Sequence, residues 1–268
     1  MERVSSYAES RPQWTPFSRY RHSLWLLTRR DLRVRYSTSA LGYVWSILDP
    51  LLMSAIYWFV FTVIFERTVG DEPYIVFLLT ALLPWMWFNS TVSDSTRAFL
   101  RESKLIRSTT IPRTIWVNRI VLSKGIEFLA SLPVLAVFAI FSGAPVNIDL
   151  IFFPLAILLQ AVLTVGVSLI VAPLVVFFRD IERAVKLTLR LLFYASPIIY
   201  GTTDLPDQLQ IWAAFNPLSG IFGIYRAAFF SEQLNWFDVG ISAVVSVALL
   251  LVGITVFRRL ERAVLKEI

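Results

Sequence analysis

Six long apolar segments constrain the fold of this chain more than any other feature of its sequence. They lie at residues 40–65, 74–92, 116–141, 150–178, 184–200 and 237–257. A helix of about 20 apolar residues crosses the hydrocarbon core of a bilayer. Only 16% of the 268 residues are charged, compared with about a quarter in soluble domains. We therefore expect an all-α integral membrane protein with six transmembrane helices.

The basic residues divide unevenly between the segments that join these helices. Of the 25 Lys and Arg, 23 fall in residues 1–39, 97–124, 179–190 and 258–268. Lys and Arg collect in cytoplasmic loops of membrane proteins. This distribution predicts an even number of crossings and two cytosolic termini. It also explains the net charge of +6 without a nucleic-acid partner, and we expect none.

A seventh apolar stretch, residues 211–230, is long enough to cross a bilayer but is interrupted by Asn216-Pro217 and Gly220. A seventh crossing would place the basic tail outside the cell. We therefore predict that residues 202–235 form a re-entrant helix hairpin, which enters and leaves on the external side with Asn216 and Pro217 at its apex. Protein or water has to satisfy the backbone groups that such a break frees.

The segment before the first span combines apolar residues with six arginines, four of which lie in its second half: Arg29, Arg30, Arg33 and Arg35. Residues 17–36 are too charged to span, and they fit an amphipathic helix lying in the membrane interface. The alternative is a soluble helix that caps the bundle. We thus divide the chain into a cytosolic arm and interface helix (1–39), a transmembrane domain (40–258) and a cytosolic tail (259–268).

The sequence contains little that suggests catalysis. It has no cysteine and a single histidine, His22, so disulfides, thiol chemistry and cysteine-ligated metals are excluded. It has no G-x-x-x-x-G-K-[ST] phosphate-binding loop, and no paired carboxylates recur in an apolar setting. We expect no catalytic residues, no metal and no cofactor on this chain.

Aromatic side chains gather in the first, second and fifth predicted spans. Interfacial belts and lipid contact account for many such residues in membrane proteins. The others are candidates to line a channel, because aromatic rings stack on the apolar faces of sugars. The candidates are Tyr57, Trp58, Phe59, Trp85, Trp87, Phe88, Phe193, Tyr194 and Tyr200.

Residues 29–52, RRDLRVRYSTSALGYVWSILDPLL, resemble the start of the first span in ABC-2 type permeases that export polysaccharides. The residues that carry this resemblance are Arg30, Asp31, Arg35, Tyr36, Ser39, Leu41, Gly42, Trp45 and Pro50. Three further pieces are similar: IPR at 111–113, FFRDIERAV at 177–185, and SPIIY with FNPLSGIFGIYR within 196–226. Together they extend over nearly the whole chain from about residue 20.

The resemblance implies a permease subunit that exports a lipid-linked polysaccharide across a bacterial inner membrane. It implies a homodimer with a channel between the first and fifth spans. It also implies two cytosolic ABC ATPase subunits, which bind the ATP and Mg. An exporter of a small hydrophobic compound or drug is the alternative, followed by a secondary transporter that works without an ATPase.

The resemblance also gives roles to residues at the cytosolic side. The loop at 94–119 would dock on the ATPase through Arg101, Glu102, Ser103, Lys104, Leu105, Ile111 and Pro112. Arg29, Arg30 and Asp31 would lie at the same interface. The anionic phosphate of the lipid carrier makes Arg29, Arg30, Arg33 and Arg35 candidates to hold it, with plain headgroup contact as the equal alternative.

Overall fold

The computed structural model describes residues 15–37, 44–64 and 73–268. These ranges contain helices and joining loops and no β-strand, which confirms the all-α fold class. The α-helices are α1 (Pro16–Ser37), α2 (Val44–Trp58), α3 (Tyr74–Ser95), α4 (Ala98–Arg101), α5 (Ser103–Ser108), α6 (Thr114–Phe141), α7 (Phe153–Phe177), α8 (Asp180–Ala195), α9 (Asp207–Ala214), α10 (Pro217–Ala227) and α11 (Trp236–Glu267). The π-helix η1 (Phe59–Ile64) continues α2, and the 3-10 turns are η2 (Ile148–Phe152), η3 (Thr202–Asp204) and η4 (Ser231–Gln233).

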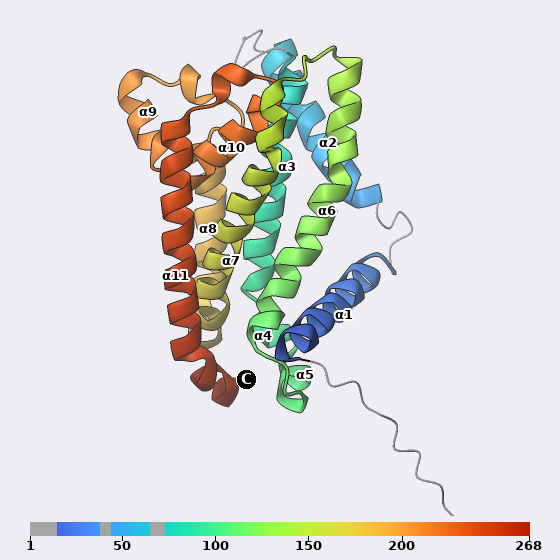
Figure 1. The fold of residues 1–268 in the computed structure, drawn as a ribbon, viewed down its shortest axis with the longest axis vertical. Helices are drawn as coiled ribbons and strands as arrows, with labels where there is room; N and C mark the ends of the chain where they lie inside the picture. The colour runs from blue at the N-terminus through green and yellow to red at the C-terminus, as the bar shows by residue number, and fades with distance from the viewer. Residues whose placement is uncertain (1–14, 38–43, 65–72) are drawn as a thin grey trace, which may run out of the picture.

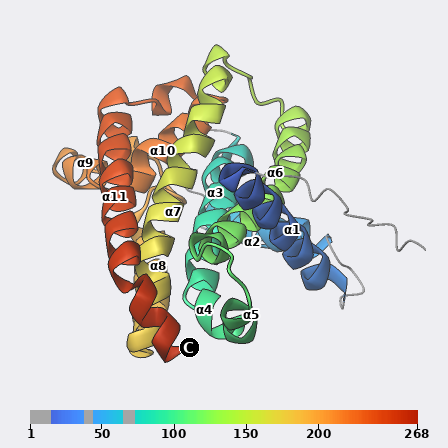
Figure 2. The same cartoon turned by 60° about the horizontal axis from the view of Figure 1, so that its bottom comes forward.

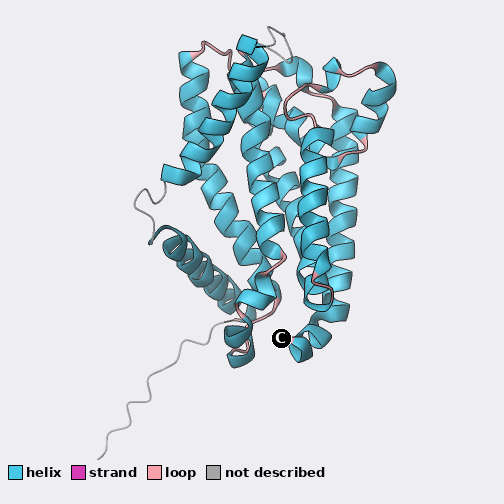
Figure 3. Cartoon of the chain, turned by 180° about the vertical axis from the view of Figure 1, so that it is seen from behind, coloured by secondary structure: helices cyan, strands magenta, loops and turns pink. Residues whose placement is uncertain are grey.

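The long helices run side by side as one bundle (Figure 1). Helices α1, α4 and α5 lie at the same end as the C-terminus, and α9 and α10 lie toward the opposite end. Figure 2 turns the first of these ends toward the viewer. Seen from behind in Figure 3, the bundle is helical through its length and its loops are short. The segments predicted to be basic and cytosolic thus share one end, which we name the charged end.

Four helical segments in the described part of the chain are long and apolar enough to cross a membrane. They are Tyr74–Ser95, Thr114–Phe141, Ile148–Phe177 and Trp236–Glu267. They correspond to the second, third, fourth and sixth predicted spans. The first predicted span is represented by α2 and η1, and the flanking residues 40–43 and 65 lie outside the described ranges. A count of six spans therefore stays a prediction.

The fifth predicted span differs most from the structure. We expected residues 184–200, whereas α8 runs from Asp180 to Ala195 and has only 16 residues. The helix ends there because Pro197 disfavours the helical conformation in the residue before it, and Ser196 is extended with φ −97° and ψ 148°. Because the helix begins four residues earlier than predicted, Asp180, Glu182 and Arg183 lie within it.

Glycines allow α7 and α11 to approach closely. A Cβ added to Gly166 of α7 would lie 2.6 Å from the backbone nitrogen of Leu250, and a Cβ on Gly253 of α11 would overlap the carbonyl of Gly166. Small residues at membrane-helix crossings let the backbones come within contact distance. This crossing joins two of the four apolar helices along much of their length.

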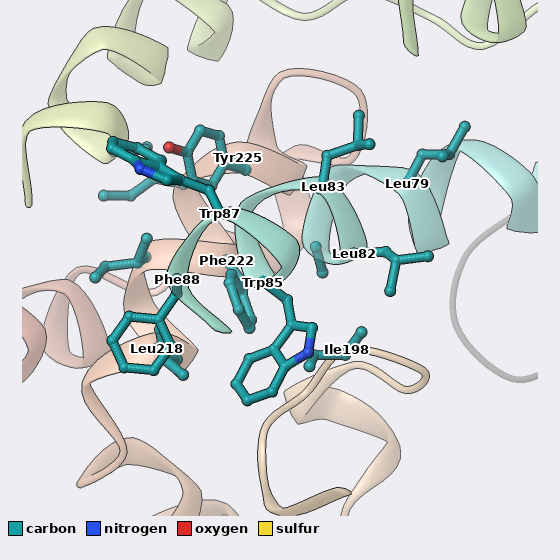
Figure 4. Close-up of a cluster of buried hydrophobic side chains, with 14 of the residues drawn as sticks. Leu79, Leu82, Leu83, Trp85, Trp87, Phe88, Ile198, Leu218, Phe222 and Tyr225 are labelled. Atoms are coloured by element: carbon teal, nitrogen blue, oxygen red, sulfur yellow. The ribbon is translucent and has the colours of Figure 1, made fainter. Parts of the chain in front are cut away.

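The core lies where α10 packs against α3, α7 and α11. Leu218, Phe222 and Tyr225 of α10 are buried, and they lie near Trp85 and Phe88 of α3 (Figure 4). A polar side chain in this interior has a partner, since Gln160 of α7 donates from Nε2 to the carbonyl oxygen of Pro84 at 2.6 Å. Helix α10 is therefore part of the bundle interior, and it is enclosed on three sides by longer helices.

Candidate functional site

Four charged side chains join three parts of the chain at the charged end. Arg119 of α6 donates from Nη1 to both carboxylate oxygens of Asp31 in α1, at 2.6 and 2.8 Å, and from Nη2 to Glu102 at 3.3 Å. Arg30 of α1 donates to Glu102 at 2.5 Å and to Asp31 at 3.2 Å. Glu102 is the residue between α4 and α5. We name these four residues the ion network.

Arg119 lies at the centre of the ion network. Its side chain is only 5% exposed, compared with 23% for each carboxylate and 36% for Arg30. The guanidinium also lies 5.2 Å from the ring centre of Trp116, one turn earlier in α6. Arginine suits this place because its planar fork of donors can satisfy two carboxylates at once. The pairing holds α1 and the α4–α5 segment against the start of α6.

A second polar contact fixes α1 to α6. Asn118 donates from Nδ2 to the hydroxyl of Tyr20 at 2.8 Å. Thr28 of α1 is fully buried, whereas Phe17, Trp25 and Val34 are exposed. Helix α1 therefore packs one side on the bundle and leaves apolar side chains exposed on another.

An open cavity of 520 Å³ adjoins the ion network. Its lining includes Arg30, Arg101 and Arg119 together with Asp31, Asp94 and Glu102. These three cations and three anions balance, so the cavity lining has no net positive charge that would attract an anionic ligand. Within the described ranges, no cluster of three His, Cys, Asp or Glu has the arrangement of a metal site. The geometry suits a joint between helices better than a binding pocket.

The residues predicted to dock on an ATPase divide into two groups. Arg101, Lys104 and Pro112 are exposed, and Ser103, Leu105 and Ile111 are half-buried. Glu102 belongs to the ion network instead. Leu105 packs beside the buried cluster that includes Phe99 and Trp116. Residues 98–108 thus present a basic outer surface and an inner surface that is tied to the bundle.

The arginines predicted to hold a lipid phosphate also divide. Arg29 and Arg33 are exposed, whereas Arg30 is paired with Glu102 and Asp31. The side chain of Arg35 lies outside the described residues. Asp31, predicted for the same interface, is bound by Arg119. Among the described members of this set, Arg29 and Arg33 are therefore the ones that are exposed and lie outside the ion network.

The candidate channel aromatics lie in different environments. Trp87 is buried in the core, where it stacks on Phe128 at 5.2 Å and donates from Nε1 to the carbonyl of Val121 at 3.2 Å. Trp85 and Phe88 are also buried. Trp58, Phe59 and Tyr194 are exposed, and Tyr57, Phe193 and Tyr200 are half-buried. Only the last two groups present a surface outside the core of this chain.

Asn216 and Pro217 mark the turn between α9 and α10, as the sequence predicts. The Asn216 side chain accepts a hydrogen bond from the Leu218 N–H at 3.1 Å and caps α10, and Pro217 occupies its first turn. The Nδ2 of Asn216 donates to the hydroxyl of Ser196 at 2.8 Å, just beyond α8. Asparagine and proline favour these two positions. The turn is thereby anchored to the end of α8.

Two charged features escaped the sequence analysis. Arg97, just before α4, pairs with Glu182 of α8 at 2.6 Å, and Lys186 pairs with the same carboxylate at 2.6 Å. Hydrogen bonds from Arg97 and Lys186 lower the pKa of Glu182 to about 2.

Arg226 of α10 is buried, donates to the carbonyls of Ile198 and Tyr200, and lies over the ring of Phe77. Its position inside an apolar stretch was the one available signal.

Comparison with known proteins adds an independent finding. A family model described as ABC-2 type transporter matches residues 22–230. The O-antigen export system permease protein RfbA of Klebsiella pneumoniae is 35% identical over 237 residues, which cover 88% of this chain and 91% of that protein. RfbA of Myxococcus xanthus is 30% identical over 80% of this chain and 83% of its own length. The polysialic acid transport protein KpsM of Escherichia coli is 24% identical over 88% of this chain and 92% of its own.

Proposed function

This chain belongs to the ABC-2 type transporter family, and we propose that it is the membrane-spanning permease subunit of an ATP-driven polysaccharide exporter. The substrate would be a lipid-linked glycan that moves from the cytosol across the bacterial inner membrane. The names of the relatives, which export O-antigen or transport polysialic acid, support this substrate class. The observation that carries the proposal is the ion network, since it gives an apolar bundle a fixed, charged platform at one end.

The charged end, which the ion network holds together, is the proposed contact with two cytosolic ATPase subunits. These subunits would bind the ATP and Mg. The exposed Arg101 of α4 and Lys104 of α5 would meet the ATPase; both helices lie at the charged end (Figure 2). Glu102 lies between them in sequence and is bound by Arg119. A displacement of α4 and α5 would therefore be transmitted to α6 and α1 as one body, because the pairs that join them are short and partly desolvated.

Two copies of the chain would enclose the channel. Helix α2 exposes Leu52, Met53, Ile56 and Trp58, an apolar surface that lipid or a second copy could cover. We place the glycan path between α2 and α8 of the two copies, along Trp58, Phe59 and Tyr194. Trp87 and Phe88 are omitted from this path because they pack inside the bundle. In this arrangement α2 with η1 and α8 complete six spans per chain.

The α9–α10 hairpin would lie at the external mouth of this channel. Helix α10 is buried among α3, α7 and α11, and α9 exposes Ile211 and Trp212. Both helices lie toward the end opposite the charged end (Figure 1). A buried break satisfies the requirement that irregular backbone at membrane depth be covered by protein. We propose that the hairpin enters and leaves on the external side.

The test is reconstitution with the ATPase in lipid discs, with ATP hydrolysis measured as defined lipid-linked oligosaccharides are added. Stimulation by these glycans supports the proposal. Stimulation only by small hydrophobic compounds would favour drug export, and transport without any ATPase would refute an ABC exporter. Lys104→Glu should weaken ATPase binding, because it reverses an exposed charge on α5. Arg259→Glu reverses the charge of an exposed residue on α11 and serves as the matched control.

A further inference from the structure

Helix α8 carries a row of basic side chains on one face. Arg183, Lys186 and Arg190 are separated by three and four residues, which places them above one another on a helix. All three are exposed, and Leu189 is the one buried residue of α8. Helix α8 packs on α3 and α7, with Leu189 in the buried core and Val185 and Leu192 packed against it. We name Arg183, Lys186 and Arg190 the cationic stripe.

The stripe extends to the depth of the apolar helices. Phe193 of α8 contacts Trp85 with ring centres 5.6 Å apart, and Trp85 lies at the middle of α3, Tyr74–Ser95. Arg190 precedes Phe193 by three residues, which is about 4.5 Å along a helix. Arg190 is therefore within one turn of the midpoint of a helix long enough to span a bilayer.

A cation at this depth is unfavourable against lipid. Ionisable side chains within membrane spans face the protein interior or a water-filled cavity. Lys186 is paired with Glu182, but Arg183 and Arg190 form no hydrogen bond or ion pair with the described residues. The exposed surface of α2, by comparison, is apolar at Leu52, Met53 and Ile56. The stripe therefore requires a polar surrounding that this copy of the chain does not supply.

We propose that the cationic stripe lines a hydrated path and binds the phosphate of a phosphorylated lipid headgroup. Guanidinium groups bind phosphate through paired, charge-assisted hydrogen bonds. Arg183 and Arg190 are seven residues apart, about 10.5 Å along the helix, so a phosphate can pass from the charged end toward the bundle centre between successive cations. This inference rests on the proposed export of a lipid-linked substrate and assigns the track along which its anionic group moves.

The first test measures water access, and the chain suits it because it has no native cysteine. Arg190→Cys is compared with Leu251→Cys in the permease–ATPase complex in lipid discs. Leu251 is an exposed residue of α11, next to Leu250, which meets Gly166 near the middle of α7. A charged, membrane-impermeant thiol reagent should modify the Arg190→Cys variant about tenfold faster or more, because only a hydrated site admits it. Equal, slow rates in both variants would overturn the proposal.

The second test measures phosphate binding with polyprenyl monophosphate in the discs. This probe should slow modification of the Arg190→Cys variant, whereas neutral polyprenol and inorganic phosphate at the same concentration should not. Adding Arg183→Gln should weaken this protection by about 10- to 100-fold, because a hydrogen bond to a charged group is lost, and Arg183→Lys should retain most of it. Equal protection by polyprenol or by free phosphate would refute a phosphorylated headgroup as the ligand.

The two proposals fail separately. If the thiol introduced at position 190 is inaccessible but glycans still stimulate ATP hydrolysis in the wild-type complex, the stripe is refuted and polysaccharide export stands. If that thiol is accessible and protected by polyprenyl phosphate but no glycan stimulates ATP hydrolysis, the binding track stands and its glycan cargo is refuted.

Discussion

Replacing Arg119 by Gln removes the most buried member of the ion network. Two cations and two anions balance in the native cluster, so the variant leaves Arg30 alone to neutralise both Asp31 and Glu102. Removing one partner of a buried ion pair costs about 3–5 kcal/mol. Both carboxylates keep 23% exposure, and solvent screens the charge that remains. We therefore expect a loss at the lower end of that range, about 3 kcal/mol.

The assay is denaturant unfolding in mixed micelles, followed by ATPase stimulation in the reconstituted complex. Arg101→Gln is the matched control for the unfolding assay only, because Arg101 lines the same cavity but is exposed, and it should change stability by less than about 0.5 kcal/mol. The double variant Arg119→Gln with Glu102→Gln restores charge balance and should be more stable than Arg119→Gln alone. If Arg119→Gln unfolds like Arg101→Gln, the ion network does not hold these helices.

Two further predictions concern packing and pH. Gly220→Ala should destabilise the protein by about 1–3 kcal/mol, because the added Cβ would overlap the backbone carbonyl of Asp238. Gly240→Ala is the control, because there is open space around its Cβ, and it should be neutral or stabilise the protein by up to about 1 kcal/mol. Equal shifts in unfolding temperature for the two variants would contradict this prediction. Hydrogen bonds from Arg97 and Lys186 lower the pKa of Glu182 to about 2, from about 4.3 in an unfolded chain. The stabilisation is therefore complete above the unfolded value and is lost only as the pH falls through about 2. The difference in unfolding temperature between wild type and Glu182→Gln should be constant from pH 8 to pH 5, and a change within that range would show that other groups set it.

The sequence was sufficient to predict the elements that depend on local chemistry. Apolar runs predict α3, α6, α7 and α11, and the predicted helix at 17–36 is α1. Asn216-Pro217 predicts the turn before α10 because asparagine caps and proline starts helices. Lys124 and Glu127 are three residues apart, a spacing that places two side chains on one helix face, and in α6 they pair at 3.1 Å. In each case the relevant partners are near in sequence.

The ion network could not be predicted because its members are far apart in sequence. Arg30 and Glu102 are separated by 72 positions, and Asp31 and Arg119 by 88. The arginines of residues 17–36 all fit headgroup contact, so the pattern gives Arg30 the same role as Arg29 and Arg33. Only the packing of α1 on α6 separates them. The same limit applies to Trp87, whose burial depends on the nearby Gly125 and Phe128 of α6.

Helix α8 shows how counting basic residues by segment can hide where each of them lies in the structure. The positive-inside count treats residues 179–190 as one cytosolic group, and Arg179, which precedes the helix, lies at its start. In the structure, however, α8 begins at Asp180, and Lys186 and Arg190 lie along α3 between the charged end and the Phe193–Trp85 contact. The same basic residues therefore first indicate which end faces the cytosol and then extend from it toward the bundle centre. A row of cations that begins at the charged end and stops one turn below Phe193 is placed where an anionic headgroup would enter, and the aromatic residues above it, Phe193 and Tyr194, lie where sugar rings would follow.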